Sequence, residues 1–262
     1  MRRARPVADP GGIELPPGAV VIADLHLDAA RADGHEAFLE FLRGVSARPA
    51  LLILGDLFDA WVGPAHGRLP GAKLILAALR RASDSGVAIS LVPGNRDFLL
   101  DSNFTDSTGA RLFPEGVRAV LPSGERILFL HGDELCTLDL GYQRLKRVVR
   151  SAPVRWLAPR LPDALALGIA RRLRRASTSA VQHKPALTKR QQEAEVRARA
   201  ALASADTVIC GHAHEFRDER LVPGPRWIVL DAFLGPRDML LVGAAGGLEP
   251  GSSRIFRGTA TA

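Results

Sequence analysis

Acidic, amide and imidazole side chains stand at five places in the chain, each directly after a short apolar run. The five segments are Asp24-Leu25-His26, Gly55-Asp56, Gly94-Asn95, His131-Gly132 and Gly211-His212-Ala213-His214. Carboxylate, amide and imidazole groups all bind divalent cations. Each segment alone is weak evidence, but the ordered set predicts a two-metal centre that activates water for attack on phosphorus.

The apolar runs predict strands that carry these side chains to one edge of a sheet. Residues 19–23, 51–54 and 87–92 are typical of buried strands, and each ends at one of the first three segments. A hairpin over 117–130 precedes His131, residues 207–210 precede His212, and residues 227–230 and 239–242 add late strands. Helical periodicity at 38–42 and 74–79 fills the intervals. The mixture predicts an α/β sandwich of two sheets flanked by helices.

Length and composition are those of a globular protein. The chain has 262 residues, of which 47% are hydrophobic, enough for a substantial core. Cys136 and Cys210 lack a C-x-x-C spacing, so we expect buried, reduced thiols. The basic start lacks an apolar signal-peptide core, and no run reaches about 18 apolar residues. We therefore expect a cytoplasmic protein with at most peripheral membrane contact.

One segment carries most of the positive charge. Fifteen Lys and Arg and only three acids lie between Arg144 and Arg199, whereas the remainder has 20 basic and 25 acidic residues. The first ligand-type residues of successive site segments are Asp24, Asp56, Asn95, His131 and His212, which are 32, 39, 36 and then 81 positions apart. These observations predict a core of residues 1–139 and 201–262 and a basic helical insertion at 140–200. From its residues alone this insertion fits a solvated face, a lipid surface or a nucleic-acid contact equally well.

The site segments also resemble a known superfamily. Asp24-x-His26, Gly55-Asp56-x-x-Asp59, Gly94-Asn95-Arg96-Asp97, His131 and Gly211-His212-x-His214 are similar to the motifs of the calcineurin-like metallophosphoesterases. The resemblance implies one metal ion on Asp24, His26 and His214, a second on Asn95, His131 and His212, and Asp56 shared between them. It implies catalytic roles for Asp56, Asn95, Arg96, His131 and His212.

Arg96 departs from the usual third motif of that superfamily, which reads Gly-Asn-His-Asp. An arginine cannot act as a general acid because its pKa exceeds about 12, but its guanidinium can hold a phosphate through several donors. The substrate then needs a leaving group that departs without much protonation. A phosphoanhydride meets that requirement better than an alkyl phosphodiester.

Longer strings resemble one subfamily, the UDP-2,3-diacylglucosamine diphosphatases of lipid A biosynthesis. They are residues 22–27, 54–61, 94–100, 131–137 and 139–143. The resemblance implies a cytoplasmic enzyme that binds two Mn²⁺ ions and associates peripherally with the inner membrane. Its substrate would be an acylated UDP-sugar lipid, cut at the pyrophosphate to UMP and 2,3-diacylglucosamine 1-phosphate. No nucleic-acid partner is expected, and the oligomeric state stays open.

In that subfamily an inserted helical lid covers the site, and residues 140–200 occupy the same interval. The resemblance implies a set of substrate-binding residues: Asn95, Arg96, Asp139, Arg174, Ser177, Lys184 and His212. Leu165, Ile169 and Leu173 recur at helical spacing and predict an apolar face toward lipid, with arginines elsewhere. Val181 and Asp231-Ala232-Phe233 depart from the usual Asn and Gly-Ala-Trp, which bears on acyl or sugar preference.

Two alternatives remain at this stage. One is a metal-dependent phosphodiesterase or nuclease whose basic insertion grips nucleic acid, and the other is a non-catalytic lipid-surface binding module.

Asp97 is a candidate for orienting nearby metal ligands, as are Asp28 and Asp59. His35, His66 and His183 have no partner at ligand spacing and are expected to be surface or incidental residues. Residues 250–262 are expected to fray.

Overall fold

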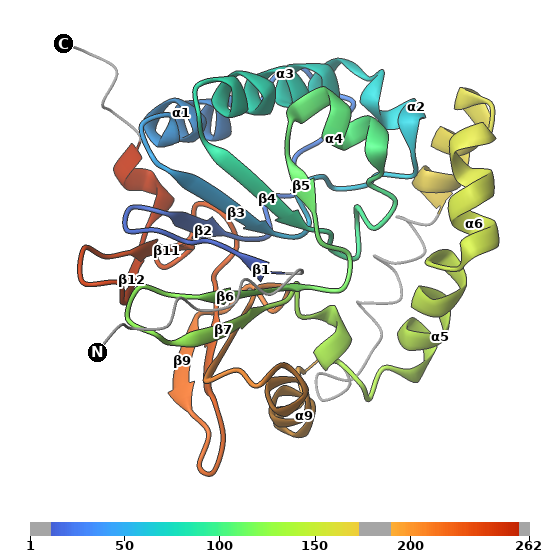
Figure 1. Cartoon of the computed structure of the whole chain (residues 1–262). Helices are drawn as coiled ribbons and strands as arrows, with labels where there is room; N and C mark the ends of the chain where they lie inside the picture. The colour runs from blue at the N-terminus through green and yellow to red at the C-terminus, as the bar shows by residue number, and fades with distance from the viewer. Residues whose placement is uncertain (1–11, 173–189, 257–262) are drawn as a thin grey trace.

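Two mixed six-stranded sheets form the centre of the computed structural model, which describes residues 12–172 and 190–256 (Figure 1). Sheet A has the order β1 (Gly12–Ile13), β6 (Val117–Val120), β7 (Arg126–Phe129), β8 (Thr207–Cys210), β10 (Arg226–Val229) and β9 (Arg217–Arg220). Sheet B has the order β12 (Leu248–Gly251), β11 (Met239–Val242), β2 (Val20–Ile22), β3 (Ala50–Leu54), β4 (Ala88–Val92) and β5 (Arg111–Leu112). The predicted two-sheet α/β architecture is confirmed.

Parallel pairing sets where the site forms. In sheet B, β2 pairs with β3, β3 with β4 and β4 with β5, all in parallel. In sheet A, β8 is parallel to both β7 and β10. The carboxyl ends of parallel strands meet at one edge of a sheet, where ligands are usually bound. The loops after β2, β3 and β4 therefore lie together, as do the loops after β7 and β8.

The main core lies between the two sheets and on the outer face of each. Alternate residues of β2 and β3 point to opposite faces. Val21, Leu52 and Leu54 pack toward sheet A, where Phe129 and Ile209 meet them. Their neighbours on the other face pack beneath helices: Val20, Ile22, Leu51 and Ile53. Because both faces of these strands are buried, the strands have continuous apolar sequences.

Helices cover both outer faces, as Figure 1 shows. On sheet B lie α1 (Glu36–Val45) and α3 (Pro70–Asp84), with α2 (Pro64–Gly67), α4 (Ser102–Thr108) and the short helix η3 (Ser253–Phe256) beside them. On sheet A lies α9 (Glu193–Ala203), which buries Val196 and Ala200 against residues that include Trp227. The buried side chains of α1 recur at i, i+3, i+4 and i+7: Phe38, Phe41, Leu42 and Val45. Full burial of one such side chain stabilises the fold by about 1.5–3 kcal/mol.

A helical segment between β7 and β8 lies beside the sandwich (Figure 1). It contains α5 (Leu140–Val149), α6 (Ala152–Leu157), the short helix η2 (Ala158–Arg160) and a helix over 163–172. On the last helix Ala166 and Ala170 pack against Val62 and Ala65 of the core, whereas Leu165 and Ile169 are exposed. Leu173 lies outside the described residues. Helix α9 crosses the predicted boundary at residue 200, and the domain limits stay a prediction.

Some expectations differ from the structure. The short edge strands β1, β5, β9 and β12 were not expected, nor were α2 and α4. Residues 248–256 form β12 and η3, and buried Phe256 stacks edge-on against Phe41, so the frayed end does not begin at residue 250. Within the described ranges, no helix is long and apolar enough to cross a membrane.

Two of the histidines expected to be surface or incidental residues are buried. His35 is buried, and its Nε2 lies 3.0 Å from the Asp28 carbonyl and 2.9 Å from the Arg31 carbonyl. His66 is also buried, and its Nδ1 accepts a hydrogen bond from the Val62 amide at 3.4 Å. Both therefore contact local backbone; of the two expected alternatives, a surface position is wrong for these histidines, whereas an incidental role stays a prediction. His183 lies outside the described residues.

Candidate metal centre

The five site segments bring their polar atoms together where β2, β3, β4, β7 and β8 end. Ligand-type atoms form two groups, and within each group the atoms lie within 4.8 Å of one another. The groups are Asp24, His26 and His214, and Asp24, Asp56 and His131. The two oxygens of Asp56 face different histidines, because Oδ2 lies 3.8 Å from His26 Nδ1 and Oδ1 lies 3.7 Å from His131 Nε2. A carboxylate so placed can contact both halves of the centre.

Asn95 and His212 complete the second half. Asn95 Oδ1 lies 3.0 Å from His131 Nε2 and 3.1 Å from His212 Nδ1. The His212 amide donates to Asp24 Oδ2 at 2.7 Å, which ties the loop after β8 to the loop after β2. The structure thus gathers all seven predicted ligand side chains into one cluster.

The orientation of His131 is fixed by the backbone. Its Nδ1 lies 2.9 Å from the Leu54 carbonyl, which can only accept a hydrogen bond, so Nδ1 carries the proton. Nε2 then turns toward Asn95 Oδ1 and Asp56 Oδ1. Holding one ring nitrogen on a carbonyl leaves the other nitrogen's lone pair available to a metal.

The donor set fits divalent cations. His26 Nε2 and His214 Nε2 lie 3.1 Å apart, and His131 Nε2 faces the Asn95 oxygen, so lone pairs converge on each other in both halves. Asp24 Oδ1 is buried and accepts no hydrogen bond from the described residues, although His214 Nε2 is 3.5 Å away. Buried polar atoms are normally satisfied, so a buried carboxylate oxygen without a donor fits a ligand position for a cation.

The backbone of the centre is held in an unusual conformation. Seven non-glycine residues of the described ranges have a positive φ, and five belong to the predicted site: Asp24, His26, Asp56, His212 and His214. Their φ values lie between 49° and 69°, in the left-handed region that costs L-residues about 1–3 kcal/mol each. Such strain persists only where the surroundings enforce it, and it concentrates at functional sites.

Close backbone approach at two glycines is part of the same construction. A Cβ on Gly94 would lie 2.1 Å from Asp56 Oδ1, and a Cβ on Gly211 would lie 2.3 Å from Asp24 Oδ2. Any larger residue would displace these carboxylates. The glycines next to Asn95 and His212 are therefore required by the geometry.

Asp97 connects two of the site loops. It is completely buried, and its carboxylate accepts hydrogen bonds from the Gly94 amide at 2.7 Å and the Leu57 amide at 2.7 Å. Asp56 Oδ1 in turn accepts from the Arg96 amide at 2.8 Å. The sequence had indicated Asp97 as an orienting carboxylate, and these contacts are consistent with that interpretation.

The loop after β10 supports the centre from the other side, which the sequence did not indicate. The Phe233 amide donates to the Asp24 carbonyl at 3.2 Å, and its ring packs edge-on against Phe38 and Phe41. Asp231 accepts from the Phe216 amide at 2.7 Å, two residues beyond His214. The departure Asp231-Ala232-Phe233 therefore has a role in the fold, and its only sequence signal is an acid at the end of a strand.

The charges of the cluster act strongly on one another. Burial raises the pKa of Asp56 to about 7. For His131 burial acts downward, but the carboxylates of Asp56, Asp24 and Asp133 outweigh it and raise the pKa to about 9. Burial lowers the pKa values of His26 and His212 to about 4. Asp56 and His131 act on each other, and this pair retains a proton near neutral pH at the position where a cation would supply positive charge.

The predicted substrate-binding residues are only partly visible. Arg96 is half-buried beside the cluster, and its charge helps to lower the pKa of His26, after burial and in the same direction. Asp139 caps the start of α5 by accepting from the Tyr142 amide at 3.0 Å. Arg174, Ser177, Val181 and Lys184 lie outside the described residues.

Comparison with known proteins adds to this geometry. The family model of the calcineurin-like phosphoesterases matches residues 19–216. A UDP-2,3-diacylglucosamine hydrolase of Pseudomonas putida is 39% identical over 204 residues, which are 78% of this chain and 84% of that protein. One from Shewanella piezotolerans is 36% identical over 222 residues, 84% of this chain and 92% of that protein. The crystal structure of a dimetal phosphatase from Danio rerio aligns with a TM-score of 0.44 at 14% identity, over 90% of this chain and 97% of that one.

Proposed function

Because the chain belongs to the calcineurin-like phosphoesterase family, we propose that it hydrolyses the pyrophosphate bond of UDP-2,3-diacylglucosamine, releasing UMP and 2,3-diacylglucosamine 1-phosphate for lipid A biosynthesis. Membership makes the chain a metal-dependent hydrolase of phosphorus compounds. The substrate is inferred from the names of relatives that align over most of both chains. The observation that carries the proposal is the convergence of seven ligand-type side chains from five separate segments.

We assign the side chains to two metal ions, for which Mn²⁺ is our proposal. Asp24, His26 and His214 would hold one ion, Asn95, His131 and His212 the other, and Asp56 both. When bound, the two cations supply Lewis acidity that activates water and offsets the charge of the phosphoryl group. His131 is oriented for this task by the Leu54 carbonyl, and the Asn95 loop is held in place by Asp97.

Arg96 is proposed to hold the substrate rather than to transfer a proton. Its backbone is fixed at both ends, because the amide donates to Asp56 and the carbonyl accepts from the Trp61 amide at 2.9 Å. The guanidinium stays charged through the reaction and can donate several hydrogen bonds to a phosphate. Attack at either phosphorus of a pyrophosphate expels a phosphate monoester, which leaves without an acid, and this is consistent with the anhydride substrate.

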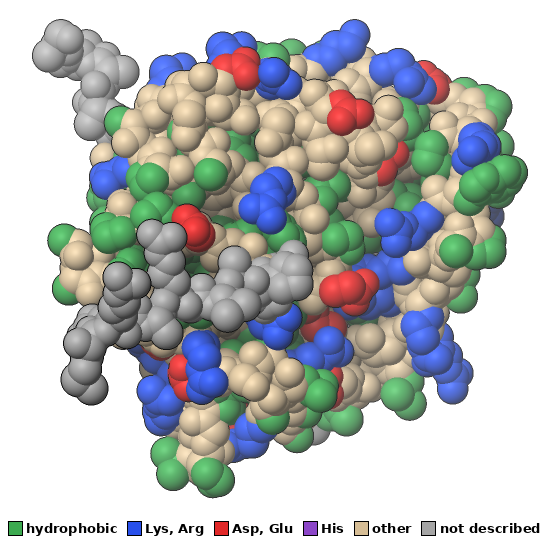
Figure 2. All heavy atoms as spheres, in the orientation of Figure 1, with side chains coloured by type: hydrophobic (Ala, Val, Ile, Leu, Met, Phe, Trp, Pro, Cys, Tyr) green, Lys and Arg blue, Asp and Glu red, His purple; other side chains and the backbone are tan. Residues whose placement is uncertain are grey.

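The helical segment at 140–200 is proposed to act as the lid that binds the acyl chains and sugar. We keep Asp139, Arg174, Ser177 and Lys184 as candidate substrate contacts, together with Asn95, Arg96 and His212. Large apolar side chains are exposed on the helices of this segment, among them Leu140, Val148, Trp156 and Leu157. Apolar and basic side chains alternate along the right-hand side of the molecule in Figure 2, where Figure 1 places α5 and α6.

This mixed surface supports a peripheral position on the cytoplasmic face of the inner membrane, which is the localisation we propose. Apolar groups can enter the headgroup region while arginines contact anionic lipids. Flotation with vesicles of phosphatidylethanolamine and phosphatidylglycerol tests it. Trp156→Ser and Leu157→Ser together should reduce bound protein several-fold at low salt. The exposed pair Val222→Ser and Ile255→Ser, away from this segment, is the control, and equal flotation of both pairs would contradict the proposal.

Turnover on three substrates tests the reaction. The Mn²⁺-loaded protein should release UMP from UDP-2,3-diacylglucosamine much faster than it cleaves bis-p-nitrophenyl phosphate or single-stranded polynucleotide. Asp56→Asn should abolish all metal-dependent cleavage and so shows that the activity belongs to this centre. Preferential cleavage of the polynucleotide would instead favour a nuclease that uses the basic segment to grip phosphates.

A further inference from the structure

A buried carboxylate lies between the candidate metal centre and the helical segment. Asp133 follows His131 by two residues, and its side chain is completely buried. Its Oδ2 accepts a hydrogen bond from the Tyr142 hydroxyl and lies 2.8 Å from Lys146 Nζ. Arg150 Nη2 is 3.9 Å from the same oxygen. None of these residues is a predicted metal ligand.

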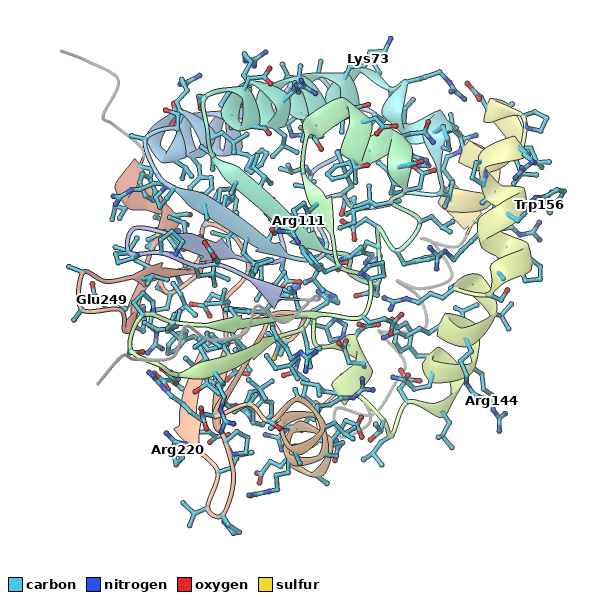
Figure 3. The ribbon with its side chains drawn as sticks, in the orientation of Figure 1. Lys73, Arg111, Arg144, Trp156, Arg220 and Glu249 are labelled. Atoms are coloured by element: carbon cyan, nitrogen blue, oxygen red, sulfur yellow. The ribbon has the colours of Figure 1, made fainter. Side chains whose placement is uncertain are left out.

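The three partners of Asp133 form one stripe on one helix. Tyr142, Lys146 and Arg150 are spaced i, i+4 and i+8 along α5 and the residue directly after it, so they lie on a single face. The Lys146 side chain is only 12% exposed, whereas Arg144 on another face is exposed and points into solvent (Figure 3). All three side chains approach Oδ2, whereas Oδ1 has no hydrogen-bond partner among the described residues. A buried carboxylate is tolerated only beside cations and donors of this kind. The contact is therefore built into the fold and is not a surface ion pair.

The same face of α5 contacts both loops of one half of the centre. Arg150 Nη2 donates to the Gly94 carbonyl at 3.3 Å, directly before Asn95. Gln143 Nε2 donates to the carbonyls of Asp133 at 3.1 Å and Cys136 at 3.2 Å. Helix α5 thus links the loop after β7, which carries His131, to the loop after β4, which carries Asn95. In the other half, His26 and His214 contact each other, and their charged neighbours are Asp56 and Asp24.

We propose that Lys146 and Arg150 are positioning residues for the Asn95, His131 and His212 half of the metal centre, acting through Asp133 and the Gly94 carbonyl. The first helix of the basic segment is then part of the metal centre as well as a neighbour of it. The inference rests on the proposed function in taking these three residues as ligands, but it does not depend on the identity of the substrate.

Titration of the EDTA-treated full chain with Mn²⁺ tests this, with calorimetry for stoichiometry and electron paramagnetic resonance for the coupled pair of ions. In Lys146→Met the first ion should bind as in wild type, and the second should bind about 10- to 100-fold more weakly, the usual cost of losing a supporting partner. Arg150→Met, which leaves the Lys146 pair in place, should show a smaller loss of the same kind. Lys146→Arg should restore the second ion.

Arg144→Met is the matched control, since it removes the same charge from the exposed side of α5. Its two binding constants should equal those of wild type. The proposal is overturned if Lys146→Met and Arg150→Met bind both ions as tightly as wild type does. It is also overturned if these variants bind both ions more weakly by the same factor and no longer unfold cooperatively. A wild-type protein that binds fewer than two ions also overturns it. A wild-type protein that binds two ions but releases no UMP leaves this inference intact and refutes the proposed substrate.

Discussion

We predict that replacing Asp97 by asparagine weakens both the fold and the metal centre. The buried carboxylate joins the loops that carry Asp56 and Asn95, through the Leu57 and Gly94 amides at 2.7 Å each. Asparagine has nearly the same shape, but one of its two terminal atoms is a donor. That donor would face a backbone N–H, so one buried amide loses its acceptor and the loop must shift.

The expected loss of stability combines two opposing contributions: the hydrogen bonds that asparagine loses and the desolvation cost of the carboxylate that it removes. Hydrogen bonds to a charged group contribute about 1.5–3 kcal/mol, and an unpaired buried donor costs about 1–3 kcal/mol. Burial raises the pKa of Asp97, so the carboxylate also carries a desolvation cost that asparagine removes. We therefore expect the free energy of unfolding to fall by about 2 kcal/mol and Mn²⁺ affinity to fall about 10- to 100-fold.

Urea unfolding of the EDTA-treated protein measures the first quantity, and calorimetric titration with Mn²⁺ measures the second. Asp106→Asn makes the same chemical change at an exposed position of α4 and should alter stability by less than about 0.5 kcal/mol. If Asp97→Asn unfolds and binds metal as wild type does, Asp97 does not hold the two loops. Loss of stability with unchanged metal affinity would confine its role to the fold.

Three further outcomes are expected. Asp56→Asn should lower turnover by more than about 100-fold and weaken both ions, because each oxygen faces one half of the centre; near wild-type rates would rule out a shared carboxylate. Arg96→Ala should lower kcat/KM on the pyrophosphate, with a loss of about 2–4 kcal/mol of transition-state stabilisation. A decrease in kcat/KM of less than about twofold would remove Arg96 from the mechanism. The raised pKa values of Asp56 and His131 mean that this pair retains a proton near neutral pH, so Mn²⁺ binding should release a proton and tighten from about pH 6 to 9. Calorimetry in buffers of different ionisation enthalpy measures the release, and zero release would contradict these shifts.

The predictable part of the fold is the part with strong local patterns. Strands β2, β3 and β4 are buried on both faces and so have continuous apolar sequences, and α1 has its apolar residues at helical spacing. The two-residue strands β1 and β5 form only because a neighbouring strand offers hydrogen bonds, and β12 contains a glutamate, a proline and a glycine. Those elements depend on tertiary pairing, which no short pattern encodes.

The site shows the same division. Its ligand-type residues could be predicted because each follows an apolar strand, and the order of parallel strands brings them together. The supporting contacts of Asp133 and Asp231 join residues from different elements, so they appear only in three dimensions. One signal was present: Tyr142, Lys146 and Arg150 recur every four residues and so mark one face of α5. Together with Asp133, the acid two residues after His131, this spacing indicates a helix packed on the site.

The central claim is that this centre cuts the pyrophosphate of UDP-2,3-diacylglucosamine. Mass spectrometry of the products formed by the Mn²⁺-loaded protein tests it most directly, with EDTA-treated protein and Asp56→Asn as controls. Equal amounts of UMP and 2,3-diacylglucosamine 1-phosphate that appear only with the metal-loaded wild type are the predicted result. Intact substrate after prolonged incubation with a protein shown to bind two Mn²⁺ ions would contradict the claim.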